Sequence, residues 1–432
     1  MERIGKYELV RELGRGATAT VYLARDPFAG REVAIKLAFP EVLKDPVRGR
    51  LQSHLFLNEA SLVGKLNHPH IAQIFDAVVD DPLCYLVMEY VPGGTLEPFC
   101  EPERLPAIDR VVEIVFKCTR ALDFAHRLGI THRDIKPANI LVCDGGHDAV
   151  ADGGPIDIKI SDFGAAITGG TECTQVNGIG SPAYMSPEQV REQALDQRTD
   201  IYSLGVVMYR LLTGQLPFQA SSHYNMIYQI LHAEPTPVAR LRPELPPALA
   251  DIVARAMARD RDERYPDWTG FAQDLARYFQ KRASPRRDFA DTEKFETLRA
   301  LPFFSDFSDV DIWETVRFSE WRFLPAGESI MRSGETGDFF CFVAEGELKV
   351  TRNGRALDLL TAGDCFGEMA VIGRRAQARS ADVSAVTDAK VVCVREEALR
   401  QASEACRMHF YEGFLDVLAN RLALANERLS AV

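Results

Sequence analysis

Residues 132–139 read His-Arg-Asp-Ile-Lys-Pro-Ala-Asn, and a second short motif, Asp-Phe-Gly, follows at 162–164. Each motif adjoins a short apolar segment typical of a β-strand: Ile140–Val142 follows the first, and Ile158–Ile160 precedes the second. Together the motifs supply a carboxylate that can accept a proton, a lysine, and amide and carboxylate oxygens that suit Mg²⁺. Chemistry on phosphates also needs groups that hold the phosphates, and residues upstream offer them.

The N-terminal part of the chain alternates short β-rich segments with turns. Gly14–Val21 (Gly-Arg-Gly-Ala-Thr-Ala-Thr-Val) lies between two of these segments, and its glycines let backbone N–H groups approach phosphates. Lys36 ends the apolar run Val33–Lys36 and needs a partner there, because lysine is rarely buried unpaired. From Ile108 onward the apolar period becomes helical, so the sequence predicts a β-rich lobe followed by an α-rich one.

In their order and spacing these motifs resemble those of eukaryotic-like serine/threonine protein kinases, the bacterial members above all. The resemblance covers about Tyr7–Phe279, including Met88–Val91 as the adenine-binding hinge and Gly180–Glu188 as the end of the activation segment. It implies the bilobal kinase fold and ATP-dependent phosphorylation of a protein substrate. One departure is Ala19, which stands where the family has a third glycine. Another is the aspartate-rich Cys143–Asp157, which indicates a solvated hairpin loop, with a calcium loop as the alternative.

The resemblance also assigns roles to single residues. Asp134 would accept the proton of the substrate hydroxyl, and Lys136 would stabilise the transferred phosphate. Asn139 and Asp162 would hold Mg²⁺. The implied catalytic set is Lys36, Glu59, Asp134, Lys136, Asn139 and Asp162. The implied ATP-contacting set is Leu13, Gly14, Gly16, Val21, Ala34, Lys36, Glu89 and Val91.

Other residues resemble the supporting parts of a kinase. Lys36 would hold the α- and β-phosphates with Glu59, on the following predicted helix, as its partner. The resemblance gives structural roles to an ion pair and to one further carboxylate: Glu188 with Arg264, and Asp200. Because the lysine, the base and the metal-binding aspartate are all present, the sequence favours an active enzyme over a pseudokinase scaffold.

The segment between Asp162 and Ser181 carries the predicted regulatory sites. Arg133 resembles the arginine that pairs with a phosphorylated residue of this segment, and such a pair would order it. Thr171 and Thr174 are the threonines favoured for that modification. The alternative is that both are ordinary loop residues.

Composition changes after Phe279. Residues 280–300 begin with the basic run Gln-Lys-Arg-Ala-Ser-Pro-Arg-Arg-Asp and are interpreted as a linker between a kinase domain at 1–279 and a second domain at 301–432. In the second domain, Phe339–Arg352 and Arg355–Leu360 alternate like strands, with turns at Glu345-Gly346 and Asn353-Gly354. Residues 405–429 are predicted to be helical. The fold class expected for the whole chain is therefore α+β.

Within this second domain, Phe-Gly-Glu-Met-Ala-Val at 366–371 and Arg-Ser-Ala-Asp-Val at 379–383 resemble the phosphate-binding cassette of cyclic nucleotide-binding domains. The resemblance implies a jelly-roll-like barrel with C-terminal helices and a ligand that is cAMP or cGMP. A helix starting near Gly367 and the guanidinium of Arg379 would hold the cyclic phosphate, and Glu368 would accept a hydrogen bond from the ribose 2′-hydroxyl. The implied ligand-binding set is Gly367, Glu368, Met369, Arg379 and Ser380. The alternative is a ligand-free dimerisation module, which would make the chain a homodimer.

The amino-acid composition argues against some classes of binding partner. The formal net charge of −12 argues against a bulk electrostatic role on nucleic acid or on anionic lipid. No apolar stretch approaches the roughly 20 residues that a membrane helix needs, and the start does not resemble a secretory signal, so we expect a cytoplasmic protein. The nine cysteines occur singly, without a C-x-x-C pair, and are expected to be reduced thiols without zinc.

Overall fold

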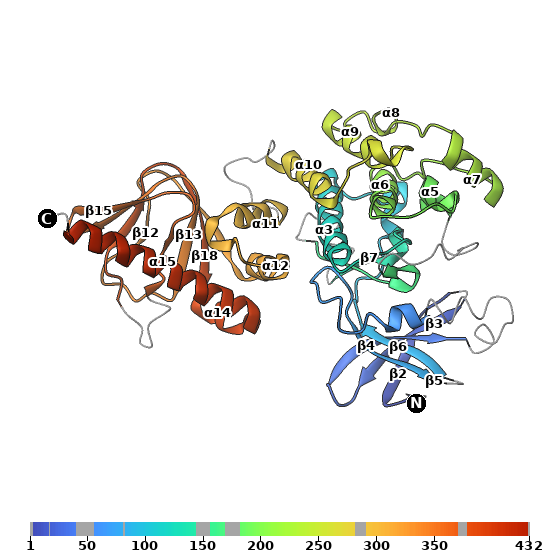
Figure 1. Cartoon of the computed structure of the whole chain (residues 1–432), viewed down its shortest axis with the longest axis horizontal. Coiled ribbons are helices and arrows are strands. Elements are labelled where there is room, and N and C mark those ends of the chain that lie inside the picture. The colour runs from blue at the N-terminus through green and yellow to red at the C-terminus, as the bar shows by residue number, and fades with distance from the viewer. Residues whose placement is uncertain are drawn as a thin grey trace. The chain divides into compact units, whose positions relative to one another are not determined.

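The computed structural model describes residues 3–16, 18–39, 56–80, 83–143, 156–168, 182–280, 291–369 and 378–430. Contacts between Cα atoms divide the chain into two compact units, Met1–Phe279 and Gln280–Val432 (Figure 1). Within the described residues, no helix combines the length and the apolar character needed to cross a bilayer.

The first lobe of the first unit is an antiparallel sheet with the strand order β1-β2-β3-β4-β6-β5. Its strands are β1 (Arg3–Ile4), β2 (Tyr7–Arg15), β3 (Ala19–Asp26), β4 (Arg31–Ala38), β5 (Ile74–Asp80) and β6 (Leu83–Glu89). Alternate residues of β4 lie on opposite faces, and Val33 and Ile35 are buried in a cluster with Tyr7 and Val87. Ala34 and Lys36 share the other face, which the register pairs with Met88 and Leu86 of β6.

The second lobe of this unit is mainly helical (Figure 1). It contains α3 (Ile108–Arg127), α5 (Pro187–Val190), α6 (Arg198–Thr213), α7 (His223–His232), α8 (Val238–Leu241), α9 (Pro247–Ala256) and α10 (Trp268–Gln280). Helices α3 and α6 are largely buried, and α3 also buries charged residues, among them Glu113 and Lys117, which form an ion pair. The lobe also contains two short antiparallel strand pairs: β7 (Ile130–Thr131) with β10 (Ile167–Thr168), and β8 (Ile140–Val142) with β9 (Ile158–Ile160).

The second unit contains two four-stranded antiparallel sheets, with the orders β11-β18-β13-β16 and β12-β17-β14-β15. The strands are β11 (Glu320–Leu324), β12 (Ser329–Met331), β13 (Phe339–Glu345), β14 (Leu348–Arg352), β15 (Arg355–Leu360), β16 (Cys365–Phe366), β17 (Asp382–Ala385) and β18 (Ala389–Arg395). Buried residues from both sheets form one core cluster. Asn353 and Gly354 both have positive φ, as the two-residue turn predicted from Asn-Gly requires.

Helices flank this barrel: α11 (Asp291–Ala300), α12 (Asp309–Phe318), α14 (Glu396–Gln401) and α15 (Glu404–Ser430). The long helix predicted at 405–429 is confirmed as α15, and its Phe410 and Phe414 pack against the aromatic side chains of Phe303 and Phe340. The linker predicted at 280–300 differs from the structure, because its second half forms α11, which packs on α12. The buried residues of α11 are Thr292, Phe295 and Leu298. They stand among charged residues, so the sequence shows no clear helical apolar pattern there.

Candidate functional site

Lys36 of β4 is held between two carboxylates from separate parts of the chain. Its Nζ atom lies 2.8 Å from Oε2 of Glu59 and 2.7 Å from Oδ1 of Asp162. Burial opposes the charge of Lys36, but the two carboxylates outweigh it and raise the pKa of Lys36. The ammonium in turn lowers the pKa of Asp162 to about 2, against the opposing effect of burial. Burial raises the pKa of Glu59, while the ammonium of Lys36 counteracts the rise.

The loop between β7 and β8 brings Asp134, Lys136 and Asn139 together. Oδ2 of Asp134 accepts hydrogen bonds from Nζ of Lys136 at 2.7 Å and from Nδ2 of Asn139 at 3.1 Å. Nδ2 of Asn139 also donates to the carbonyl oxygen of Asp134 at 2.8 Å. Because the amide nitrogen of Asn139 makes these bonds, its amide oxygen is the atom left to bind a metal.

The side chain of Asp200, at the start of α6, holds this loop by bonding two of the loop's backbone N–H groups. Its two carboxylate oxygens each accept one backbone N–H, from His132 and from Arg133, at 2.7 Å. Burial raises the pKa of Asp200, while His132 and the two N–H bonds counteract the rise. Arg133 and Asp162 both have positive φ, so non-glycine residues hold a left-handed conformation at this site.

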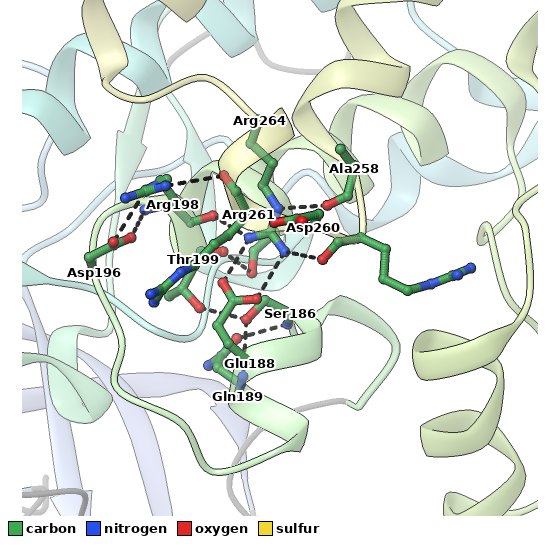
Figure 2. Close-up of polar contacts among 12 residues, drawn as sticks. Ser186, Glu188, Gln189, Asp196, Arg198, Thr199, Ala258, Asp260, Arg261 and Arg264 are labelled. Carbon is green, nitrogen blue, oxygen red and sulfur yellow. Dashed lines mark hydrogen bonds and ion pairs between the residues drawn. The ribbon is translucent and has the colours of Figure 1, made fainter.

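A buried ion pair anchors the segment that leads into α5 (Figure 2). Oε1 and Oε2 of Glu188 lie 2.7 Å and 2.9 Å from the two terminal nitrogens of Arg264. Arg264 also donates to the carbonyl oxygens of Ala258 and Arg198. Burial disfavours the charged carboxylate, but the bonds from Arg264 lower the pKa of Glu188 below its ordinary value. Ser186 caps α5, and its hydroxyl lies 2.6 Å from that of Thr199.

The remaining residues of the predicted ATP-contacting set surround Lys36 in the fold. Ala34 lies two residues before it on the same face of β4, and β6 leads directly to Val91. Gly14 near the end of β2 and Gly16 in the following turn are both exposed, and the backbone N–H of Gly16 donates to the carbonyl oxygen of Ala19. The predicted regulatory residues Thr171 and Thr174 lie outside the described residues, as does most of the aspartate-rich stretch.

The second unit brings the predicted ligand-binding residues to one side of its barrel. Arg379 is buried and donates to the carbonyl oxygens of Gly367 at 3.0 Å and Phe339 at 2.5 Å, with its guanidinium 4.8 Å from the centre of the Phe339 ring. A Cβ atom on Gly367 or Gly337 would lie within 2.7 Å of the guanidinium, so a larger residue there would displace the side chain of Arg379. Gly367 also has a positive φ, which favours glycine. Burial lowers the pKa of Arg379 from its high ordinary value.

Glu368 has a partner that sequence reasoning did not place in the site. Oε1 of Glu368 lies 2.5 Å from Nη1 of Arg421 on α15, and Arg421 also donates to the carbonyl oxygen of Cys365. Glu368 is buried, whereas Met369 beside it is exposed. Of the helix expected near Gly367, the structure describes only its first residue, Met369, and residues 370–377 lie outside the described part of the chain. The sequence does place Arg421 on the inward stripe of the last helix, but nothing in it names Glu368 as the partner.

The two-lobed fold, the paired lysine and the loop with Asp134 define the first unit as a kinase. The chain belongs to the protein kinase family, because the protein kinase domain matches residues 7–275. A separate family, the cyclic nucleotide-binding domain, matches residues 321–406. Both resemblances drawn from the motifs are thereby confirmed.

Curated relatives and solved structures agree with this assignment. The chain is 36% identical to the serine/threonine-protein kinase PknB of Mycolicibacterium smegmatis over 307 residues, which cover 69% of this chain and 47% of the relative. It is 34% identical to the serine/threonine-protein kinase PrkC of Bacillus subtilis over 304 residues, covering 70% and 45%. It thus spans about half the length of these relatives. The crystal structure of the PknI kinase domain of Mycobacterium tuberculosis superposes with a TM-score of 0.50 at 26% identity, covering 64% of this chain and 97% of that one.

Proposed function

We propose that this chain transfers the γ-phosphate of ATP to serine or threonine hydroxyls of a protein substrate. The observation that carries the proposal is the position of Lys36, which bonds both Glu59 and Asp162. In protein kinases both the lysine–glutamate pair and the metal-binding aspartate must be in place for activity. The named serine/threonine kinases among the relatives support the choice of hydroxyl.

The donor chemistry of the site fits ATP and Mg²⁺. Asp162 offers carboxylate oxygens, and Asn139 offers the amide oxygen that its hydrogen bonds to Asp134 leave available. Lys36 would hold phosphate oxygens, and Ala34 and Val91 would border the adenine. When bound, ATP supplies the phosphoryl group and Mg²⁺ neutralises the charge on the phosphates.

Asp134 and Lys136 are proposed to act on the substrate side. Asp134 orients the hydroxyl and takes its proton through the carboxylate, while Asn139 and Asp200 keep the loop fixed. Lys136 would turn from Asp134 toward the transferred phosphate, because its ammonium sits on a flexible four-carbon side chain.

The test compares phosphate incorporation from radiolabelled ATP by the wild-type chain and by Asp134→Asn. We expect the variant to lose about 10²–10⁴ of the rate, the range of general-base contributions, while still binding ATP. Asp251→Asn on the exposed face of α9 is the control and should retain wild-type activity. A wild-type chain without activity would instead support the pseudokinase scaffold, and activity that Asp134→Asn leaves unchanged would contradict the role proposed for Asp134.

We further propose that the second unit binds a cyclic nucleotide and thereby regulates the kinase in the same chain. Arg379 supports this candidate, because its guanidinium is buried against carbonyl oxygens and an aromatic ring, and no carboxylate among the described residues is bonded to it. A buried guanidinium of this kind favours an anion as ligand. Glu368, held by Arg421, is available to the ribose hydroxyl.

Kinase activity measured with and without cAMP and cGMP tests the regulation. The expected result is a change in rate with one nucleotide that Arg379→Ala removes, while basal activity stays unchanged. If cAMP or cGMP binds without changing the kinase rate, the second unit is a nucleotide sensor that is not coupled to the kinase. Neither binding nor a change in rate would favour the dimerisation module, which sedimentation of the full chain would then detect.

A further inference from the structure

Strands β13 and β18 place two cysteine side chains opposite each other in the core of the second unit. In the register of this antiparallel pair, Cys341 lies directly across from Cys393. Residues paired in this way point to the same face of the sheet. Both belong to the core cluster of the barrel, with exposed fractions of 0% and 2%. The fold therefore brings together two thiols that are 52 residues apart in the sequence.

The two sulfur atoms are in close contact. Sγ of Cys341 lies 2.7 Å from Sγ of Cys393, and both residues are free thiols in the structure. A disulfide bond holds its sulfurs at about 2.05 Å, so closing the bond needs an approach of about 0.7 Å. Directly opposed residues of antiparallel strands have Cα atoms about 4.5–5.5 Å apart, within the roughly 4.4–6.8 Å found for disulfides. The backbone register already suits the bond.

Core packing alone does not require two thiols to face each other. A free cysteine in a core behaves as a small apolar residue, and the neighbouring opposed pair on this face is Val343 with Val391. Cys365 shows that a buried cysteine of the same sheet can have another partner, because it lies opposite Phe342, on the other face of β13. The direct opposition of two thiols is the feature that packing leaves unexplained.

We propose that Cys341 and Cys393 form a modification site, at which a two-electron oxidant such as hydrogen peroxide joins them in a disulfide bond. One sulfur attacks a peroxide oxygen and the O–O bond breaks, which gives a sulfenic acid and one water molecule. The other sulfur then attacks the first and displaces its hydroxyl group as a second water molecule. Both sulfurs are thereby oxidised, both peroxide oxygens are reduced, and the two thiol protons end in the water molecules.

Burial decides which oxidants reach the site and how fast they react. It raises the pKa of Cys341 well above the ordinary value, so the thiol is protonated at neutral pH. The thiolate is the reactive form, and the reaction is therefore slow. A small neutral peroxide can enter the core, whereas a bulky charged disulfide such as oxidised glutathione cannot. We expect the first to oxidise the folded chain slowly and the second to leave it reduced.

The cysteine pair lies beside the residue that holds Arg379. Phe339 precedes Cys341 by two residues on β13, and its carbonyl oxygen accepts a hydrogen bond from Arg379 at 2.5 Å. A disulfide between β13 and β18 would therefore fix the strand that carries this carbonyl oxygen. The proposed modification itself depends on neither the kinase reaction nor cyclic nucleotide binding.

The test treats the reduced, folded full chain with hydrogen peroxide, quenches it in acid and alkylates the remaining thiols. Lys349 and Lys390 separate the three cysteines of this sheet, so trypsin places each in its own peptide. Mass spectrometry should find the peptides of Cys341 and Cys393 joined with the loss of two hydrogen atoms, and dithiothreitol should release them. Cys341→Ala should abolish the joined peptide. Cys365→Ala is the matched control and should leave it unchanged.

A comparison of oxidised and reduced wild-type chain needs no variant. The disulfide should raise the temperature of the thermal transition of the second unit by about 5–15 °C, because it restricts the unfolded chain. Peptides of Cys341 and Cys393 that are both alkylated after peroxide treatment overturn the proposal. So does a peptide of Cys341 joined to that of Cys365 in place of Cys393, or a joined peptide that forms only after the chain has been unfolded.

Discussion

At the scale of single residues, the sequence predicts which side chains carry chemistry better than it predicts their partners. Lys36 and Glu59 are paired as expected because the resemblance brings a known pairing with it. Arg421 on α15 is bonded to Glu368, which follows β16, and only the tertiary packing selects this arginine among those of α15.

Glu188 offers a prediction at the same scale. Glu188→Gln leaves the buried guanidinium of Arg264 without its charge partner, and we expect a loss of about 3–5 kcal/mol in the free energy of unfolding at pH 7. Urea unfolding of the full chain, monitored in the transition of the first unit, measures it. Glu263→Gln changes an exposed carboxylate nearby and should have almost no effect.

The same variant has a defined pH dependence. Because the pKa of Glu188 is lowered in the folded state, its stabilisation is fully present above the unfolded pKa of about 4.3 and is lost as the pH falls below that value. The difference in stability between wild type and Glu188→Gln should therefore be constant from pH 7 to about pH 5.5 and shrink toward pH 3. A difference that grows on acidification would contradict the ion pair as its source.

At the scale of elements, regular pattern and turn chemistry decide what is predictable. The hairpin β14–β15 follows from alternation and Asn-Gly, because both are local signals. Helix α11 escapes prediction because its buried side chains are few and stand among Glu, Lys and Arg, so its stability comes from packing on α12. Sequence patterns predict elements that local turn and alternation signals stabilise, and they miss elements whose stability comes from packing on another helix.

Helix α15 gives the prediction for this scale. Arg421→Ala removes the bonds to Glu368 and to the carbonyl oxygen of Cys365, so the last part of α15 loses its attachment to the cassette. We expect amide hydrogen exchange to rise after about residue 415 while the segment near Phe410 stays protected.

Arg407→Ala on the same helix is the matched control. Arg407 donates to the carbonyl oxygen of Arg400 and has no bond to the cassette in the described residues. Equal exchange in the two variants would show that the bond to Glu368 does not hold the end of α15.

At the scale of the whole molecule, each unit has its own core, and each contains one of the two proposed nucleotide sites. We expect two thermal transitions, with cAMP or cGMP shifting only that of the second unit and ATP with Mg²⁺ only that of the first. A ligand at 100 times its dissociation constant stabilises its own unit by about 2.7 kcal/mol. Calorimetry of the full chain measures both shifts. Arg379→Ala should abolish the shift caused by cAMP or cGMP and leave the shift caused by ATP with Mg²⁺ unchanged. A single transition that both ligands shift equally would mean that the units unfold together.

The turn at Asn353-Gly354 has a practical consequence. Both residues are exposed, and a Cβ atom added to Gly354 would meet nothing within 4 Å. Exposed turn tips of this kind accept inserted domains, because no buried backbone bond is broken. A fluorescent protein inserted between β14 and β15 would be attached to the barrel at an exposed turn, making the second unit the starting point for a genetically encoded biosensor.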